Sequence, residues 1–362
     1  MTRSGTSSQN RTSATNAPPR RLLISAVEPC GDLLAAELVL ALKDTHDFEV
    51  YGVAGPNMRA VGVYPVARME DINVMGLVEV MKRLGSIRKA TKSMAGAIDA
   101  GADALLVIDG PDFNLPLARR ARNRGIPAIG YVSPKVWAWR SGRVKRITKS
   151  VDQLLCLFDF EPDLYPNLDA RWVGHPVLDR VPKRRKPDQD LYALLPGSRP
   201  HEVDQMLPPF LRAARLVRRV RPKARFLLMV PAELRHGLVG LEPWIEVVGG
   251  GLEQISTVSA ALTKSGTITL ELACMAIPQV VAHRIHPVTY AVAHRLLTID
   301  AISLPNILSG SRVVPEFVQN FTADDLAEAL MTLPNHQPVD LCSLGSRGAS
   351  QRAAEAVSDW WS

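Results

Sequence analysis

Asp109 follows directly on the apolar run Leu105–Ile108, and Asp112 and Asn114 stand close behind it. A short apolar run that ends in polar residues is typical of a buried parallel strand. Ligands bind outside the carboxyl ends of such strands, so the two acids are the first candidates for chemistry. Taken alone, the stretch favours a simpler interpretation, in which Asp112 caps a helix that begins near Leu115 and Asp109 binds a loop amide.

Two further turns offer groups that bind phosphate. Gly197-Ser198-Arg199 follows a predicted strand over Leu191–Leu195 and combines backbone amides, a hydroxyl and a guanidinium. An ion pair between Arg199 and Glu202 explains the same residues equally well.

Ser265-Gly266-Thr267 stands between another predicted strand and a helix, where amides and the helix dipole favour an anion. Glu271, one helical turn later, is placed to reach a ribose diol. The same three residues are also an ordinary helix N-cap.

The elements that must position these residues alternate between strand and helix. The first unit is a strand over Arg21–Ala26, a turn over Val27–Asp32 and a helix over Leu33–Lys43. The alternation predicts an α/β fold with parallel sheets. The turn lacks the GxGxxG pattern, which disfavours a pyrophosphate loop for NAD or FAD.

Length and composition are those of a globular protein with room for two domains, at 362 residues, 46% hydrophobic and 22% charged. No apolar run reaches the length of a membrane span. The four cysteines form no CxxC pair, which favours reduced thiols over a zinc site, and we expect neither metal nor cofactor. The net charge of +7 comes without a nucleic-acid-binding motif, so we expect no nucleic-acid partner.

Changes in composition divide the chain into a basic tail, a first domain, a proline-bounded linker, a second domain and a closing helix. Their predicted limits are residues 1–20, 21–182, 183–190, 191–344 and 345–362. We expect the tail to be disordered because Ser, Thr, Asn and Pro do not build a core. The closing helix ends in Trp360 and Trp361, and it is a candidate to pack back on the first domain or to contact a membrane.

Residues 74–92 are mostly apolar in their first half and basic in their second. Such an amphipathic helix suits an anionic membrane surface. A helix that packs on the core and exposes a basic side is the better explanation from this segment alone. The residues that would meet a membrane are Met75, Leu77, Val78, Met81, Lys82, Arg83, Leu84 and Arg88.

Eight segments together resemble the lipid-A-disaccharide synthase family, glycosyltransferases that make the disaccharide of the Gram-negative outer-membrane lipid. The segments stand in the family's order and spacing, from about residue 21 almost to the end of the chain. They are Glu28–Leu34, Gly52–Met58, Val74–Val80, Ile108–Asn114, Tyr131–Arg140, Leu194–Arg199, Ser265–Glu271 and Ser303–Gly310.

The resemblance implies a GT-B fold, with two Rossmann-like, doubly wound domains and the active site in the cleft between them. It assigns the acceptor to the first domain and the nucleotide to the second. The implied reaction transfers 2,3-diacylglucosamine from UDP-2,3-diacylglucosamine to 2,3-diacylglucosamine 1-phosphate, with inversion and without a metal. Its products are the β-1,6-linked disaccharide 1-phosphate and UDP.

The resemblance also implies a role for each candidate residue. Asp109 is the base that takes the proton from the acceptor hydroxyl, and Asp112 supports it or caps the helix. Glu271 binds the ribose, and Asn306 contacts the donor or its loop. The remaining implied contacts are Gly197, Ser198, Arg199, Ser265, Gly266 and Thr267 with the diphosphate, and Glu28, Gly31 and Asp32 with substrate.

Lipid substrates shift the preference for residues 74–92 towards the membrane interpretation, because acyl chains must be drawn from a bilayer. The implied location is cytoplasmic and peripheral on the anionic inner membrane, with a homodimer as a further possibility.

The first turn departs from the family's usual Ser-Ala-Gly-Glu-Pro-Ser-Gly-Asp, since Val27 replaces the glycine and Cys30 the second serine. A β-branched residue is expected to resist a positive φ and to restrict the approach of a ligand. Two alternatives stay open, and these two replacements motivate the second of them. One is another UDP-sugar GT-B enzyme, a transferase or epimerase with a soluble substrate, and the other is a catalytically silent relative that binds lipid or nucleotide.

Overall fold

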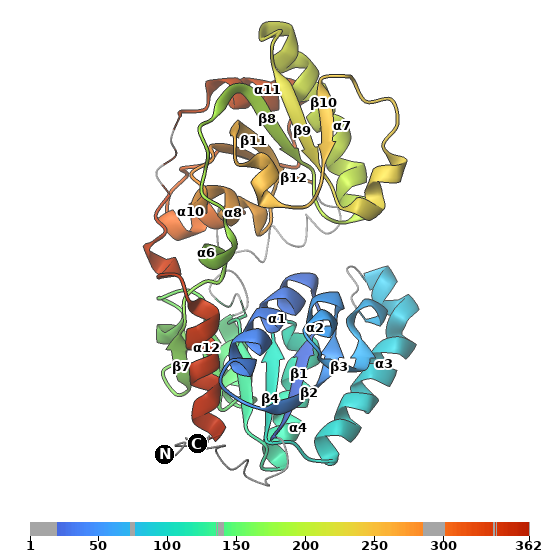
Figure 1. Cartoon of the computed structure of the whole chain (residues 1–362), viewed down its shortest axis with the longest axis vertical. Coiled ribbons are helices and arrows are strands. Elements are labelled where there is room, and N and C mark those ends of the chain that lie inside the picture. The colour runs from blue at the N-terminus through green and yellow to red at the C-terminus, as the bar shows by residue number, and fades with distance from the viewer. Residues whose placement is uncertain are drawn as a thin grey trace, which may run out of the picture. The chain divides into compact units, whose positions relative to one another are not determined.

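The computed structural model describes residues 20–72, 77–134, 136, 141–284, 301–335, 337 and 339–361. It contains two β-sheets with parallel strands and accompanying helices (Figure 1), which confirms the predicted α/β class. The chain divides into two compact units between Ala128 and Ile129, and the residues from Ser358 onward group with the first unit. The division falls within the first sheet, and the domain limits derived from the sequence stay a prediction.

The first sheet has seven strands in the order β3-β2-β1-β4-β5-β6-β7. Its strands β1 and β4 are apolar runs with fully buried inner residues, as expected for parallel strands that are covered on both faces. The strands are β1 (Arg20–Ala26), β2 (Phe48–Ala54), β3 (Tyr64–Arg68), β4 (Ala104–Ile108), β5 (Ala128–Tyr131), β6 (Gln153–Cys156) and β7 (Asp169–Trp172).

Most of the connections in this part of the chain are helical. The α-helices are α1 (Pro29–Lys43), α2 (Pro56–Ala60), α3 (Leu77–Asp99), α4 (Pro111–Asn123), α5 (Val144–Thr148) and α6 (Val177–Arg180). Short 3-10 turns cover Met69–Asp71, Ser141–Arg143 and Pro162–Leu164.

The second sheet has six strands in the order β10-β9-β8-β11-β12-β13, and every adjacent pair is parallel. Its core includes the fully buried rings of Tyr192, Phe210 and Phe226. The strands are β8 (Asp188–Leu195), β9 (Arg225–Met229), β10 (Ile245–Val248), β11 (Val258–Lys264), β12 (Gln279–His283) and β13 (Glu316–Val318).

The helices of the second half include one long element, α7, whose first turn contacts the predicted phosphate turn after β8. The α-helices are α7 (Pro200–Val220), α8 (Ile268–Cys274), α10 (Leu304–Ser309), α11 (Ala323–Thr332) and α12 (Ala349–Ser358). Short 3-10 turns cover Ala232–Gly237, Leu252–Ile255, Cys342–Leu344 and Asp359–Trp361.

Two helices begin about one turn earlier than the sequence pattern indicates. α1 begins at Pro29 rather than at Leu33, and α4 begins at Pro111 rather than near Leu115. Proline suits the first helical position because its fixed φ is helical and its missing N–H would have no partner there. The strand β8 likewise begins at Asp188, inside the predicted linker, and pairs there with β11.

Helix α3 carries the basic segment of the sequence. Ala90, Met94 and Ile98 are buried and recur every four residues, so they form the stripe that packs on the core. Among the helices of the described ranges, none is long and apolar enough to cross a membrane.

Candidate active site

The strand order of the first sheet reverses between β1 and β4, which makes this pair a topological switch point. Ala26, the last residue of β1, lies opposite Ile108, the last residue of β4. In open α/β sheets ligands bind at such a point, outside the carboxyl ends of the two strands. Asp109 is the first residue beyond β4, so the structure places it at this position.

The buried side chain of Asn114, which is 1% exposed, ties the ends of β1 and β4 together. The hydroxyl of Ser25 donates to Asn114 Oδ1 at 2.6 Å. Asn114 Nδ2 donates to the carbonyl oxygens of Asp109 at 2.8 Å and Ile108 at 3.1 Å. The amide thus fixes the backbone of Asp109 without using its carboxylate. The sequence shows this asparagine but gives no sign of its partners.

The chain turns sharply at Asp109 and Gly110, which both have left-handed backbones with φ of 47° and 50°. A side chain other than glycine in this region costs about 1–2 kcal/mol, and Asp tolerates it better than most. At Gly110 a Cβ atom would lie 2.2 Å from Val27 Cγ2, so only glycine fits there. Strained residues that the surroundings hold in place are concentrated at functional sites.

Asp112 has a different environment from Asp109. It is exposed and is the second residue of α4, whose N-cap is Gly110. The expectation that Asp112 caps a helix starting near Leu115 is therefore wrong in detail, because the helix starts before it. An acid in the first turn still stabilises a helix by interacting with its dipole.

The first turn, predicted to contact substrate, contains one residue whose carboxylate is already engaged. Asp32 is fully buried and accepts hydrogen bonds from the backbone amides of Gly55 at 2.8 Å, Asn57 at 2.8 Å and Met58 at 3.2 Å. These amides begin α2, so Asp32 fixes the turn after β2. A Cβ atom at Gly55 would lie 2.5 Å from this carboxylate, which explains the glycine.

Gly31 and Val27, in the same turn, lie beside the end of β4. Gly31 is buried, and a Cβ atom there would lie 3.3 Å from Ile108 Cγ2, whereas Glu28 and Cys30 are exposed. Val27 is not among the described residues with positive φ, so the expected backbone conflict at this position is wrong. Its side chain instead packs against Gly110.

The second sheet also reverses its strand order, between β8 and β11, and the two predicted phosphate turns follow these strands. Glu202, in the first turn of α7 and 7% exposed, is the centre of a polar cluster there. It accepts hydrogen bonds from the Ser198 amide at 3.1 Å and from Lys264 Nζ at 2.9 Å. The predicted ion pair with Arg199 is also present, at 3.3 Å.

Glycine at position 197 allows this cluster to form. Gly197 has a φ of 131°, and a Cβ atom there would lie 2.6 Å from Glu202 Oε2. The turn therefore closes tightly over the carboxylate. Burial acts to raise the pKa of Glu202, but the hydrogen bond and charge of Lys264, with the Ser198 amide and Arg199, outweigh it and hold this pKa below its usual value.

His283 lies at the end of the neighbouring strand β12. Burial, helped by the charge of Lys264 and opposed by that of Glu202, lowers the pKa of His283 to about 4. The imidazole is therefore neutral near pH 7 and adds no charge to the cluster.

The turn after β11 is held from within the second unit. The hydroxyl of Ser265 donates to the carbonyl oxygen of Ile302 at 2.8 Å. Gly266 is exposed, and Thr267 is the N-cap residue of α8 without a side-chain capping bond. Ser265 therefore has a structural partner, and the exposed part of the turn is Gly266.

Glu271, the predicted ribose ligand, lies on α8 and is half-buried. Burial raises the pKa of Glu271, and the charge of Arg180 on α6 opposes this shift. A partly desolvated carboxyl group with a raised pKa is suited to accept or share hydrogen bonds with hydroxyl groups.

Asn306 lies on the short helix α10 and is buried. Its Nδ2 donates to Val314 O and to Glu316 Oε1, both at 2.8 Å, and its Oδ1 accepts from the Val314 amide at 2.8 Å. Glu316 also accepts from the amides of Ile302 at 3.0 Å and Ser303 at 2.8 Å. Asn306 therefore holds the loop beside the turn after β11. Glu316, which organises this network from β13, has no motif that would reveal it in the sequence.

Only part of the predicted membrane segment can be placed. Met75 lies outside the described residues, and Leu77, Val78, Met81 and Lys82 lie on α3. The exposed residues with described side chains are Arg83, Leu84 at 41% exposure, and Arg88. Arg83 also donates to the carbonyl oxygen of Glu70.

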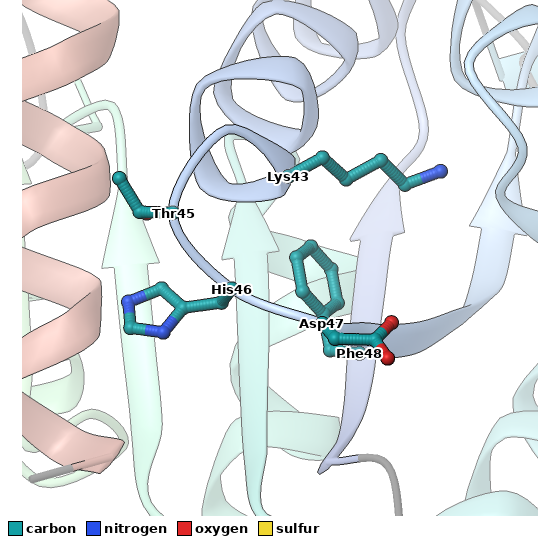
Figure 2. A pocket seen from close by; sticks show the side chains of 5 residues that line it. All are labelled: Lys43, Thr45, His46, Asp47 and Phe48. Atoms are coloured by element: carbon teal, nitrogen blue, oxygen red, sulfur yellow. The ribbon is translucent and has the colours of Figure 1, made fainter. Parts of the chain in front are cut away.

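A cavity of about 530 Å³ lies elsewhere, at the loop between α1 and β2 (Figure 2). The side chains of Lys43, at the end of α1, and His46, in the loop, extend in opposite directions, and His46 Nε2 lies 2.8 Å from Ser358 Oγ. The loop precedes β2 and so belongs to the amino edge of the sheet, away from Asp109. In the part of the chain that the structure describes, no three His, Cys, Asp or Glu side chains form a metal-binding group.

Comparison with known structures identifies the fold. The chain resembles a calicheamicin glycosyltransferase with a TM-score of 0.62, at 15% identity and with 95% of this chain and 98% of that chain covered. It resembles the UDP-GlcNAc 2-epimerase from Neisseria meningitidis with a TM-score of 0.61, at 11% identity and with 94% and 100% covered. Both likenesses place the chain in the GT-B fold.

Comparison of sequences identifies the family. The family model of lipid-A-disaccharide synthetase matches residues 22–338. A lipid-A-disaccharide synthase of Anaeromyxobacter dehalogenans is 37% identical over 93% of this chain and 96% of its own length. The enzyme of the same name from Geobacter metallireducens is 36% identical over 94% and 97%. The chain therefore belongs to the lipid-A-disaccharide synthase family of glycosyltransferases.

Proposed function

We propose that this protein transfers 2,3-diacylglucosamine from UDP-2,3-diacylglucosamine to 2,3-diacylglucosamine 1-phosphate. The acceptor hydroxyl attacks the anomeric carbon, a new β-1,6 bond forms, and the bond to UDP breaks with inversion. Relatives that share over a third of their residues across nearly the whole chain support this reaction.

The position of Asp109 carries the mechanism. An inverting transfer needs one base to take the proton of the acceptor hydroxyl as the new bond forms. Asp109 lies at the switch point of the first sheet, and the bonds of Asn114 go to its backbone and to the neighbouring carbonyl of Ile108. The turn thus holds the residue in place through main-chain contacts. We assign Asp109 as the base, and Asp112 as an acid that stabilises α4.

The leaving UDP requires positive charge and hydrogen-bond donors as its diphosphate separates. Arg199, with a side chain 29% exposed, and the turn of Ser198 are available for this at the switch point of the second sheet. We assign them, together with Gly197 and the Ser265–Thr267 turn, to the diphosphate. Glu271 is assigned to the ribose, and Asn306 to the position of the donor loop. The proposed reaction uses no metal.

The first turn is assigned to the substrate through Glu28, while Gly31 and Asp32 shape the backbone around it. The catalytically silent alternative was motivated by Val27 and Cys30. Val27 has no positive φ and its side chain packs on Gly110, while Cys30 is exposed. The alternative of a soluble substrate gains no support from the relatives, which are named for the lipid reaction.

The test of the function is UDP release in the presence of both diacylated substrates. We expect one UDP for each disaccharide, and no UDP when the acceptor is left out. UDP release without disaccharide, or neither product above background, would refute the proposed reaction.

The test of the base compares Asp109→Asn with Asp112→Asn. The first change should lower kcat by about 10²- to 10⁴-fold, because it removes the proton acceptor. Asparagine adopts left-handed conformations readily, so the turn should survive, and circular dichroism would check this. Asp112→Asn is the matched control and should keep kcat within about threefold, since helix-dipole contacts affect mainly stability. A folded Asp109→Asn variant with an unchanged kcat would remove Asp109 as the base.

We further propose that the protein works in the cytoplasm, bound peripherally to the anionic inner membrane. Leu84 is exposed on α3 between Arg83 and the basic residues Arg88 and Lys89. Apolar and cationic side chains on one helix suit the surface of an anionic bilayer. A homodimer stays a prediction, which sedimentation analysis would check.

The membrane proposal predicts binding to vesicles that contain an anionic lipid. Because each basic residue near such a surface contributes about 1 kcal/mol, the pair Arg88→Glu and Lys89→Glu should weaken binding at least about tenfold. The pair Arg219→Glu and Lys223→Glu, on exposed positions around the end of α7, makes the same change in charge and should have little effect. Equal loss in both pairs would mean that only net charge matters, and would contradict a role for α3.

A further inference from the structure

Lys264, the last residue of β11, connects the two turns at the switch point of the second sheet. Its Nζ donates to Glu202 Oε1 at 2.9 Å, next to the Ser198–Arg199 turn. The same Nζ donates to the carbonyl oxygen of Ser265 at 3.3 Å, in the turn after β11. The ammonium group therefore lies between the two segments assigned to the diphosphate.

The cluster has more positive than negative charge. Glu202 is its one anion among the described side chains that make these bonds, and Arg199 and Lys264 both contact its Oε1 atom. His283, whose pKa is affected by the charges of Lys264 and Glu202, is neutral near pH 7. The excess is one positive charge, on side chains that are 14% exposed for Lys264 and 29% exposed for Arg199. A surplus cation that is partly buried is poorly hydrated and favours an anionic ligand.

We propose that Lys264 is a further donor-binding residue, whose ammonium group contacts the diphosphate of a nucleoside diphosphate. This inference rests on the proposed transferase function. Two N–H groups of Lys264 have partners among the described residues, and the third is left for a phosphate oxygen. Glu202 is a positioning residue, because it holds the flexible lysine at the turn before the ligand arrives.

A competing explanation is that Lys264 only neutralises the buried carboxylate of Glu202. Removing one partner of a buried pair leaves the other charge unpaired, which destabilises the local structure by itself. The single variant Lys264→Met does not separate the two explanations. The double variant Glu202→Gln with Lys264→Met does, because it removes both charges and leaves no unpaired carboxylate.

The experiment measures binding of UDP, UMP and uridine by calorimetry to the full-length protein. Lys264→Met and the double variant should both lose at least about tenfold in affinity for UDP, as expected for one charge-assisted hydrogen bond, while uridine changes by less than about twofold. The loss of affinity for UMP should be intermediate between the losses for UDP and for uridine. Arg225→Met is the matched control, since Arg225 pairs with Asp188 at the amino end of β9 and its loss should leave all three affinities unchanged. Lys264→Gln replaces Lys264→Met if the latter does not fold.

Two results would overturn the inference. Recovery of wild-type affinity for UDP in the double variant would mean that Lys264 only balances Glu202. An equal loss for uridine and UDP would mean that the effect does not involve the diphosphate. The transferase function is tested separately, by disaccharide formation. If the wild-type protein binds UDP but makes no disaccharide, the comparison of UDP affinities still tests the role of Lys264. If the wild-type protein does not bind UDP, the proposed role of Lys264 is rejected.

Discussion

One buried amide, that of Asn114, holds the switch point of the first sheet in place. It bonds to the Ser25 hydroxyl from β1 and to the carbonyl oxygens at the end of β4. A buried amide with unmet hydrogen bonds is costly, so the two strand ends and the first turn of α4 are confined to one arrangement. The left-handed turn at Asp109 and Gly110 depends on that arrangement, and so does the position of the proposed base.

In the second sheet, too, one buried polar side chain holds the switch point in place, but it is a charged carboxylate instead of an amide. Glu202 collects the Ser198 amide, Arg199 and Lys264 around one buried carboxylate at the switch point between β8 and β11. The network of Glu316 and Asn306 holds the loop beside the turn after β11. Both sheets thus place a rigid polar centre where parallel strands diverge, which is where an α/β fold leaves room for a ligand.

The sequence predicted the strand ends and the turns that carry the candidate residues, because apolar runs and glycine-containing turns are local signals. It placed the starts of α1 and α4 one turn too late, since Pro29 and Pro111 begin these helices rather than precede them. The contacts of Asn114, Lys264 and Glu316 could not be predicted from the sequence. Asn114 meets Ser25 89 positions away, Lys264 meets Glu202 62 positions away, and Glu316 meets Asn306 10 positions away. All these partners lie on other elements, and no local pattern in the sequence specifies which groups meet across a sheet. The backbone conflict expected at Val27 was also wrong, because this residue has no positive φ and its side chain packs against Gly110 on a distant segment of the chain.

The central claim is that the Asn114 amide sets the geometry of the proposed base at Asp109. Its most direct test is to measure kcat for disaccharide formation and the affinity for UDP in Asn114→Leu, with Ser25→Ala as a milder variant that removes one hydrogen bond. Leucine matches asparagine in size but leaves the carbonyl oxygens of Ile108 and Asp109 without their donor. We predict that kcat falls at least about tenfold, because a misplaced base is inefficient, while the affinity for UDP stays unchanged. A folded Asn114→Leu variant with the kcat of the wild type would contradict the claim.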